Sequence, residues 1–334
     1  MKLKHCIRAV VFGLLCMIML IFLSKQFQYI DRSIWSTNAR VENFQDLPDQ
    51  SVDVLFLGTS NVMSSINPLQ IWQDTGLQTY NYCGRAQSFP FTYAYLKDAL
   101  KTQSPECIVI DAWSVFSDHI TYELADSEFH FRLNMESLSW SSAKFDLIKK
   151  YVPVKDHLSM YLPIIKNHND YKTWTMEADE TDHIFMGYCY VDKTVPFDVP
   201  QYSDVSTPIP EPDRDAVDQI IQLCQEENII PIFIKTPAVL TDEQHAKING
   251  LGDYLAEKDV LFYNLTADES YGFSFQTGLS DNTHVNSAGA KDVTSFVIQM
   301  LSNQMEEKER STHQYAYIWE AEYQRMLEVL TPKS

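Results

Sequence analysis

Five short runs rich in apolar and aromatic residues recur along the chain after its first fifty residues. Polar or amphipathic stretches separate them. Continuous apolar runs, rather than alternating ones, are typical of strands that are buried on both faces of a parallel sheet. We therefore predict five strands, at residues 52–57, 78–82, 107–110, 229–234 and 259–265.

Amphipathic segments lie between these runs. In residues 88–102, for example, Phe91, Tyr95 and Ala99 recur on one face of a helix. The alternation of strands and helices predicts an α/β fold with a parallel sheet that is covered by helices on both faces. The predicted helices cover residues 68–75, 88–102, 213–227, 241–257 and 287–305.

The alternation is interrupted once, from about residue 113 to residue 212. This stretch contains helical patches, many aromatic residues and several prolines, which indicates an insertion over one end of the sheet. We predict a single domain over residues 51–305 that includes the insertion. A polar stem over residues 25–50 precedes it. A charged helical tail over residues 306–334 follows, and its aromatic residues could dock it elsewhere.

The N-terminus has the pattern of a membrane segment. Lys2, Lys4 and Arg8 precede an unbroken apolar run over residues 9–23, which approaches the length that spans a bilayer. We interpret residues 1–24 as an uncleaved signal anchor with its basic end in the cytoplasm and the rest of the chain outside. A cleaved signal peptide is the alternative, although no small-x-small cleavage site follows the run.

The chain is acidic, with a formal net charge of −19. Residues 1–24 contain three basic and no acidic residues, so the remaining chain has a charge of −22. A negative charge of this size opposes binding to nucleic acid and to anionic lipid surfaces. No nucleic-acid partner is therefore expected.

Four cysteines follow the predicted anchor: Cys83, Cys107, Cys189 and Cys224. An oxidising compartment would allow disulfides among them. Cys107 and Cys224 lie in or beside apolar elements, which favours buried free thiols for these two. The pairing stays open at this point.

A first candidate for chemistry is Gly58-Thr59-Ser60, directly after the first predicted strand. In an open α/β sheet, ligands bind beyond the carboxyl ends of the strands. Gly58 allows a tight exit from the strand, and Ser60 would present its hydroxyl near backbone N–H groups that can stabilise an oxyanion. The simpler interpretation is that Ser60 only caps a helix.

A second candidate is Asp281-Asn282-Thr283-His284, directly before the last predicted helix. A serine hydroxyl needs a base to accept its proton, and His284 can supply one. Asp281 could hold the imidazole in the correct tautomer. Such a spacing also arises by chance in polar loops.

Gly84, at the end of the second predicted strand, is a third candidate because its N–H could also face an oxyanion. A lone glycine there is more often only a turn. In order and placement, Ser60, Gly84 and the Asp281–His284 block resemble the SGNH/GDSL hydrolase family over residues 50–112 and 213–303. The resemblance implies a flavodoxin-like, doubly wound five-stranded core. It also implies acyl transfer by Ser60, Asp281 and His284, with Ser60 and Gly84 forming the oxyanion hole.

One departure from this family pattern concerns the oxyanion hole. The family usually has an Asn after its third strand, whereas this chain has Asp111-Ala112-Trp113-Ser114. Losing one oxyanion donor costs about 2.7–4 kcal/mol in the transition state. The departure also motivates an alternative, in which the chain is a non-catalytic scaffold with the same core.

A membrane helix and an insertion together resemble the branch of this family that acts on bacterial envelope polymers. That branch is similar to alginate acetylation proteins and to the accessory protein of teichoic-acid D-alanylation. The resemblance implies a cell-membrane location with an extracytoplasmic domain, a polymer or glycan substrate, and a membrane-bound O-acyltransferase as partner. It is carried by residues 84–88, 95–97, 131–132, 139–141, 167–171 and 187–188.

Within the insertion, four further side chains could contact an acceptor, although packing is the simpler role for each: Arg132, His157, His168 and Trp174. We find no P-loop, dinucleotide-binding glycine motif or metal-ligand cluster in the sequence. No cofactor is therefore expected.

Overall fold

The computed structural model describes residues 2–116, 125–169, 180–266, 271–310 and 313–331. Its centre is a five-stranded sheet in the order β2-β1-β3-β6-β7, and every neighbouring pair of strands is parallel. The predicted α/β fold with a parallel five-stranded sheet is therefore confirmed. The strands are β1 (Val54–Gly58), β2 (Thr79–Cys83), β3 (Cys107–Asp111), β6 (Ile230–Lys235) and β7 (Leu261–Asn264).

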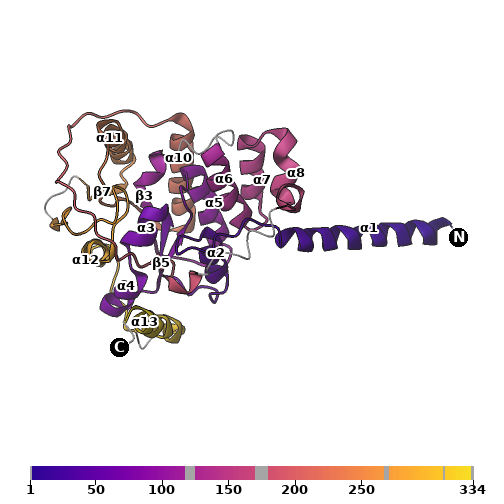
Figure 1. Cartoon of the computed structure of the whole chain (residues 1–334), viewed down its shortest axis with the longest axis horizontal. Helices are drawn as coiled ribbons and strands as arrows, with labels where there is room; N and C mark the ends of the chain where they lie inside the picture. Colours follow the sequence, from indigo (N-terminus) through magenta and orange to yellow (C-terminus); the bar gives the residue numbers. More distant parts are fainter. Residues whose placement is uncertain (1, 117–124, 170–179, 267–270, 311–312, 332–334) are drawn as a thin grey trace.

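The strand order explains why helices cover both faces of the sheet. The chain moves from β1 outward to β2 and then crosses back to β3. Because such crossovers are right-handed, the helices of these two connections lie on opposite faces. Accordingly, α5 packs against α10, whereas α12 packs against α3 and α4 (Figure 1). The covering helices are α3 (Ser60–Ser65), α4 (Pro68–Thr75), α5 (Phe89–Ala99), α10 (Glu211–Glu227), α11 (Asp242–Glu257) and α12 (Ser287–Ser302).

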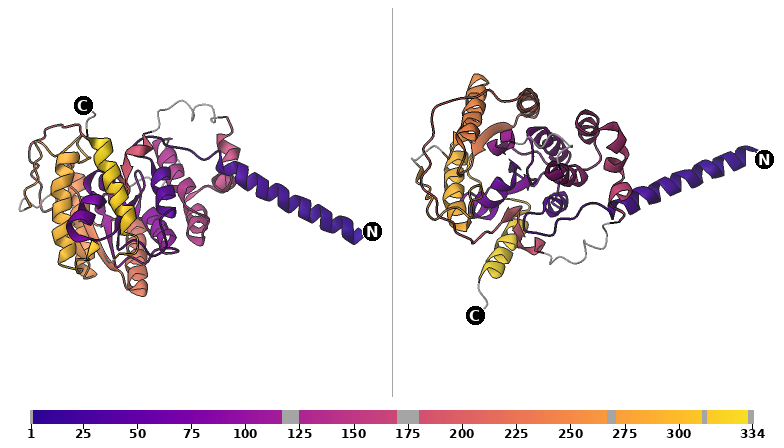
Figure 2. Two further views of the ribbon diagram at one scale, coloured as in Figure 1. Left: turned by 90° about the horizontal axis from the view of Figure 1, so that it is seen from below. Right: turned by 45° about the horizontal axis from the view of Figure 1, so that its top comes forward.

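The insertion between β3 and α10 forms a helical lobe and a small hairpin. The lobe packs beside α5 and α2, on the side of the molecule from which α1 projects (Figures 1 and 2). The hairpin contacts α3, so it lies close to Ser60 in the fold. The described elements of the insertion are α6 (Ala125–Ser137), α7 (Ser142–Tyr151), α8 (His157–Tyr161), α9 (Ile164–Asn167), β4 (Ile184–Phe185) and β5 (Tyr188–Cys189).

The N-terminal segment forms one long helix, α1 (Lys2–Lys25), which projects away from the rest of the molecule (Figure 1). Its apolar side chains are exposed along nearly its whole length. By length and composition, α1 meets the requirements of a membrane span, and a signal sequence meets the same requirements.

The stem expected over residues 25–50 contains a helix that packs onto the domain. Helix α2 (Thr37–Gln45) contacts β2 and α6, and it buries Val41 and Phe44. Arg40 is also buried, and it donates hydrogen bonds to three backbone carbonyl oxygens, including that of Gly187 in the hairpin. Two apolar residues three positions apart in a polar stretch are a weak signal, which explains why the sequence pattern suggested only a polar stem.

The tail contains α13 (Ala316–Leu330), which docks against α4 and the hairpin strand β4. Trp319 is fully buried there, and its indole N–H donates to the carbonyl oxygen of Thr79 at 3.1 Å. Tyr317 points to solvent, with 67% of its surface exposed. The expected docking of the tail is thus achieved mainly by one tryptophan.

Candidate active site

Ser60 lies at the carboxyl end of β1, where the strand turns into α3. Gly58 makes the turn possible because its φ is +139° and an added Cβ would lie 2.4 Å from the Cβ of Asp111. Thr59 is the N-cap residue of α3, and its side chain accepts a hydrogen bond from the Asn61 N–H. Ser60 is therefore the first residue of the helix, and it is partly exposed to solvent.

His284 and Asp281 lie in a tight loop that leads into α12. The loop is closed by a bridge between Leu279 and Val285 and by a hydrogen bond from the Ser280 N–H to the His284 carbonyl oxygen. Asn286 then caps α12 by accepting two backbone N–H groups. These constraints fix the direction in which the His284 side chain leaves the loop.

The structure brings the three predicted residues into one chain of hydrogen bonds. Ser60 Oγ lies 2.9 Å from His284 Nε2. On the other side of the ring, His284 Nδ1 lies 3.0 Å and 3.1 Å from the two carboxylate oxygens of Asp281. This is the serine–base–orienter geometry that activates a hydroxyl nucleophile.

Asp281 is held as a carboxylate. Partial burial alone would raise its pKa, but hydrogen bonds from the His284 ring, the Thr283 N–H and the His284 N–H outweigh that effect. The pKa of Asp281 therefore lies well below its ordinary value. A carboxylate at Asp281 favours the tautomer of His284 that donates from Nδ1, which leaves Nε2 to accept the Ser60 proton.

Trp35 forms one wall of this site. Its ring lies against the His284 ring, with centroids 4.8 Å apart and an interplanar angle of 48°. Trp35 belongs to the segment between α1 and α2. The sequence pattern did not indicate this residue, because nothing in a polar linker marks one tryptophan as part of a site.

A buried polar cluster supports the Ser60 turn from below. Thr59 Oγ1 donates to Asp111 Oδ2 at 2.5 Å, and the Trp113 N–H donates to Asp111 Oδ1 at 3.0 Å. Lys235 at the end of β6 is fully buried close by, with its ammonium 4.8 Å from the centroid of the Trp113 ring. Burial lowers the pKa of Lys235 to about 8, although Asp111 opposes the shift.

Asp111 has a structural role at the end of β3. Burial raises its pKa, whereas Lys235 and the hydrogen bonds from Thr59 and Trp113 act in the opposite direction. The cluster ties β1, β3 and β6 together immediately below Ser60. Lys235 was not predicted to belong here, because a lysine that ends an apolar strand normally marks the strand's exit to solvent.

The predicted oxyanion role of Gly84 requires a correction. Its N–H donates to the Gly58 carbonyl oxygen at 3.1 Å, which continues the pairing of β1 with β2, so the structure does not present it to a substrate. Gly84 instead permits close packing, since an added Cβ would lie 1.8 Å from Asn134 Oδ1. The Ser60 N–H is a better donor, because the first amide of a helix has no acceptor within the helix.

The further candidates in the insertion have structural partners of their own. Arg132 is buried and forms an ion pair with Glu136 at 2.6 Å. The His157 ring contacts the Val152 carbonyl oxygen at 2.9 Å, and the His168 ring contacts backbone carbonyl oxygens of its own helix. Trp174 lies outside the described residues.

All six cysteines are free, and the four that follow α1 are buried. Burial raises the pKa of the Cys107 and Cys224 thiols, which makes them unreactive. Within the described ranges, no group of three or more His, Cys, Asp or Glu side chains could hold a metal ion.

No protein-family model and no curated protein matches this chain. Three similar solved structures are a candidate acylhydrolase from Bacteroides fragilis, a GDSL-like lipase from Bacteroides thetaiotaomicron and a candidate lipolytic protein of the G-D-S-L family from Desulfitobacterium hafniense. Their sequence identities to this chain are 11%, 10% and 10%, with TM-scores of 0.40, 0.40 and 0.38. The matches cover 79%, 82% and 74% of this chain and 94%, 100% and 97% of the other chains. At this level of similarity, the function has to be inferred from the residues of the chain itself.

Proposed function

We propose that this chain is a serine esterase or O-acyltransferase of the SGNH/GDSL type, acting through an acyl-serine intermediate. The observation that carries the proposal is the hydrogen-bonded series Ser60–His284–Asp281, with 2.9 Å between Ser60 Oγ and His284 Nε2. The three residues come from opposite ends of the domain, and the fold places them together at the carboxyl edge of the sheet.

The proposed first half-reaction forms the acyl-enzyme. His284 Nε2 accepts the Ser60 proton while Ser60 Oγ attacks the carbonyl carbon of an acyl ester. The Ser60 N–H then donates to the oxyanion of the tetrahedral intermediate. When the intermediate collapses, His284 returns the proton to the leaving alkoxide, and Asp281 stabilises the imidazolium in between.

The second half-reaction decides between the two activities. His284 removes a proton from water or from an acceptor hydroxyl, whose oxygen attacks the acyl carbon and releases Ser60. Water gives a hydrolase, and a glycan hydroxyl gives a transferase.

We propose the bacterial cell membrane as the location, with α1 as an uncleaved anchor and the domain outside. The substrate class is an acylated glycan or other polymer of the cell envelope, and a membrane-bound O-acyltransferase would be the acyl donor. The supporting observations are the exposed apolar surface of α1 and the short connection of ten residues, Gln26–Trp35, between its end and the site. A donor in the same membrane would have a raised effective concentration at Ser60.

The test is to compare turnover of short acyl esters by the purified full-length chain with and without glycan acceptors. Transfer predicts an acylated acceptor in the mass spectrum and faster ester consumption when acceptor is added. Rapid hydrolysis with no acceptor effect would establish an esterase, and no turnover of either kind would contradict both activities. The Ser60→Ala variant is the matched control.

A non-catalytic scaffold is the second candidate, and the missing oxyanion Asn after β3 motivates it. In this alternative, the core serves only to bind a membrane partner or polymer. It predicts that Ser60→Ala fully restores the function of a strain that lacks the gene. Failure of Ser60→Ala to restore function, at equal protein level, would support the enzyme instead.

A further inference from the structure

The insertion has an apolar surface beside the end of α1. Outside α1, the described residues include twelve exposed large hydrophobic side chains, and five of these lie between residues 140 and 165. Clustered exposed apolar side chains mark contact surfaces more reliably than scattered ones. We define the juxtamembrane face by these five residues: Trp140, Phe145, Val154, Leu158 and Ile165, with exposed fractions of 52%, 44%, 82%, 58% and 43%.

The aromatic part of this face is preorganised. The Trp140 ring centroid lies 6.1 Å from those of Phe145 and Tyr161, and the latter two rings are 5.3 Å apart. Tryptophan and tyrosine are enriched where proteins meet the membrane–water boundary, because their rings combine an apolar body with a polar edge.

Hydrogen bonds fix the position of the juxtamembrane face along the axis of α1. The Ile164 N–H donates to Ser24 Oγ at 3.2 Å, and the Asn167 side chain donates to the Phe27 carbonyl oxygen at 2.9 Å. The Gln28 side chain donates to the Glu136 carbonyl oxygen at 2.7 Å. The end of α1 is therefore attached to the insertion, and in Figure 1 α8 lies above the last turn of α1.

The length of α1 places that last turn at a bilayer boundary. Its 24 residues correspond to about 36 Å of helix, whereas the hydrocarbon core is about 30 Å thick. If the basic N-terminus remains in the cytoplasm, Lys25 lies in the headgroup region on the other side. The juxtamembrane face then lies at the same depth.

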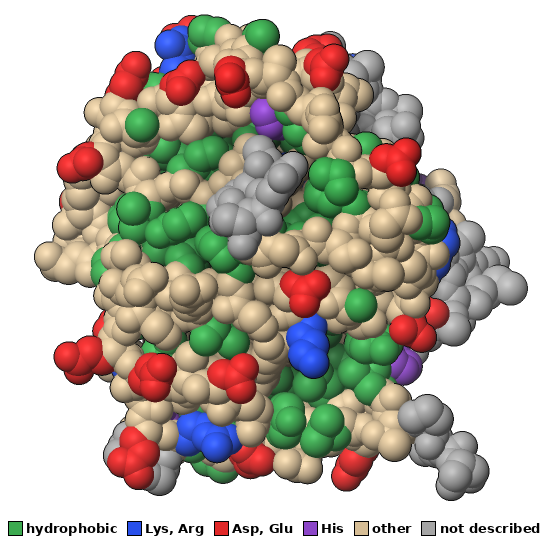
Figure 3. All heavy atoms as spheres, turned by 90° about the vertical axis from the view of Figure 1, so that its left-hand side faces the viewer, with side chains coloured by type: hydrophobic (Ala, Val, Ile, Leu, Met, Phe, Trp, Pro, Cys, Tyr) green, Lys and Arg blue, Asp and Glu red, His purple; other side chains and the backbone are tan. Residues whose placement is uncertain are grey.

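The charge of this part of the chain also differs from the rest. Residues 140–168 contain five lysines and two aspartates, in a chain of net charge −19. Lys144 is buried, and Lys150 and Lys166 pair with Asp215 and Glu128 outside this range. Lys149 and Lys155 are exposed beside the apolar side chains. The face farthest from α1 shows many acidic side chains and few basic ones (Figure 3). The positive charges of Lys149 and Lys155 complement the anionic headgroups of a membrane surface, although the net charge of the chain is negative.

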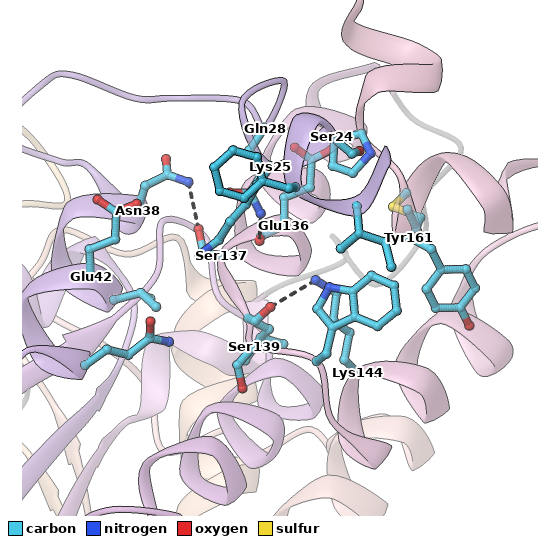
Figure 4. A pocket seen from close by; sticks show the side chains of 18 of the residues that line it. Ser24, Lys25, Gln28, Asn38, Glu42, Glu136, Ser137, Ser139, Lys144 and Tyr161 are labelled. Carbon is cyan, nitrogen blue, oxygen red and sulfur yellow. Dashed lines mark hydrogen bonds between the residues drawn. The ribbon is translucent and has the colours of Figure 1, made fainter. Parts of the chain in front are cut away.

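A groove of about 540 Å³ separates α1 from the lobe. Ile18, Ile21 and Phe22 line its α1 side, and Trp140 and Tyr161 line its lobe side. Figure 4 shows Tyr161 and Lys144 on the lobe side of this groove, with Asn38 and Glu42 at its other end. Its apolar part is adjacent to the segment of α1 that would lie within the hydrocarbon.

We propose that the juxtamembrane face lies on an anionic bilayer surface, with Trp140, Phe145 and Leu158 inserted among the lipids and Lys149 and Lys155 at the headgroups. The proposal rests on α1 being a membrane anchor, and it goes beyond the acyl-transfer chemistry. The domain then contacts the membrane at two places, through α1 and through the juxtamembrane face. The membrane then holds the domain, and with it Ser60, in one orientation.

The test uses the full-length chain in nanodiscs that contain phosphatidylglycerol and phosphatidylcholine. A nitroxide is attached to Leu158→Cys in a background in which the exposed Cys6 and Cys16 are replaced by serine. Val205→Cys is the matched control, because Val205 is equally exposed, at 59% against 58% for Leu158. Collisions with oxygen, which concentrates in lipid, and with a water-soluble nickel chelate are then measured by electron paramagnetic resonance.

We expect the oxygen-to-nickel collision ratio at position 158 to exceed that at position 205 several-fold. A second variant, Lys149→Gln combined with Lys155→Gln, should lower the ratio at position 158 in anionic nanodiscs and leave it unchanged in purely zwitterionic ones. A circular dichroism spectrum and a thermal unfolding midpoint equal to those of the wild type show that the domain is folded in each variant.

A nitroxide on Cys16, in a separate chain in which only Cys6 is replaced by serine, separates the two ways in which the proposal can fail. If Cys16 is in lipid while position 158 is as accessible to nickel as position 205, the anchor stands and the membrane-contact proposal is wrong. The face would then be free for a protein partner. If Cys16 itself is in water, both the anchor and the membrane contact are wrong, whereas the acyl-transfer chemistry is unaffected.

Discussion

Trp35 lies against His284, with 4.8 Å between the two ring centroids. Trp35 belongs to the segment that connects α1 to the domain, and His284 belongs to the loop before α12. The same segment is fixed by an ion pair of 3.0 Å between Asp31 and Arg85. The segment between α1 and α2 therefore has two roles: it connects the domain to α1, and it contributes Trp35 to the site.

The first prediction concerns this contact. Replacing Trp35 by Ala should slow acylation of Ser60 by about 2- to 10-fold, because an aromatic contact contributes about 0.5–1.5 kcal/mol and holds the imidazole in place. Trp35→Phe keeps an aromatic ring and should retain most of the rate. Stopped-flow measurement of ester turnover gives the comparison. Equal rates for Trp35→Ala and the wild type would show that the contact does not matter for the chemistry.

The second prediction concerns the tautomer of His284. Asp281→Asn keeps the size of the side chain but removes the charge, and it should lower kcat by about 10⁴-fold, as the loss of the orienting carboxylate does in serine proteases. Asn282→Asp, which alters the exposed neighbour in the same loop, should change kcat little. A loss of less than about tenfold in Asp281→Asn, which is about 1.4 kcal/mol, would mean that Asp281 is not the orienter.

The third prediction concerns the support under Ser60. Thr59→Val removes the hydroxyl that donates to the buried Asp111, and it should lower the free energy of unfolding by about 1.5–3 kcal/mol, the range for hydrogen bonds to charged groups. In an Asp111→Asn background, the same change should cost less, because the acceptor is no longer charged. Urea unfolding of the four proteins gives the coupling energy. A coupling energy of zero would contradict the role of this hydrogen bond.

The fourth prediction is a pH dependence of stability. The pKa of Lys235 is about 8 in the folded chain because burial disfavours its charge, and it is about 10.4 in an unfolded chain. Between these values, the unfolded chain binds more protons, so the contribution of Lys235 to stability rises with pH. Below pH 8, Lys235 is charged in both states, and the full cost of burying its charge then lowers the stability of the folded chain.

The Lys235→Met variant tests this sign. The quantity to compare is the free energy of unfolding of the variant minus that of the wild type. This difference should be highest at pH 7, and it should fall by about 2–3 kcal/mol as the pH rises from 8 to 10.5. Lys149→Met, at an exposed position, should show no such trend. A stability difference for Lys235→Met that is the same at pH 7 and pH 10 would rule out a buried, charge-disfavoured lysine.

Much of the sheet could be predicted from the sequence because its strands are short, continuous apolar runs. Val54 to Leu57 is one such run, and each of its side chains is fully buried. Ser60 and His284 could be selected because each lies directly beside a predicted element, where a parallel sheet brings chain segments together.

Other parts of the site depend on contacts that no local pattern contains. Whether the Gly84 N–H is available depends on the register of β2 against β1, which continues one hydrogen bond beyond the paired strands. From the sequence, Lys235 is expected to be an exposed residue at the end of a strand, but in the fold it is buried beside the Trp113 ring. Trp35 lies against His284 in a segment that is held by the packing of α2 and by the ion pair between Asp31 and Arg85.

The measurement that tests the central proposal most directly is fluorophosphonate labelling of the full-length chain, followed by mass spectrometry of the labelled peptide. The wild type is compared with Ser60→Ala and His284→Ala. We expect label on Ser60 in the wild type, none in Ser60→Ala, and labelling in His284→Ala slowed by at least about 10³-fold, because the hydroxyl then has no base. No label on Ser60 in folded wild-type protein, or labelling that is equally fast without His284, would contradict an activated serine nucleophile.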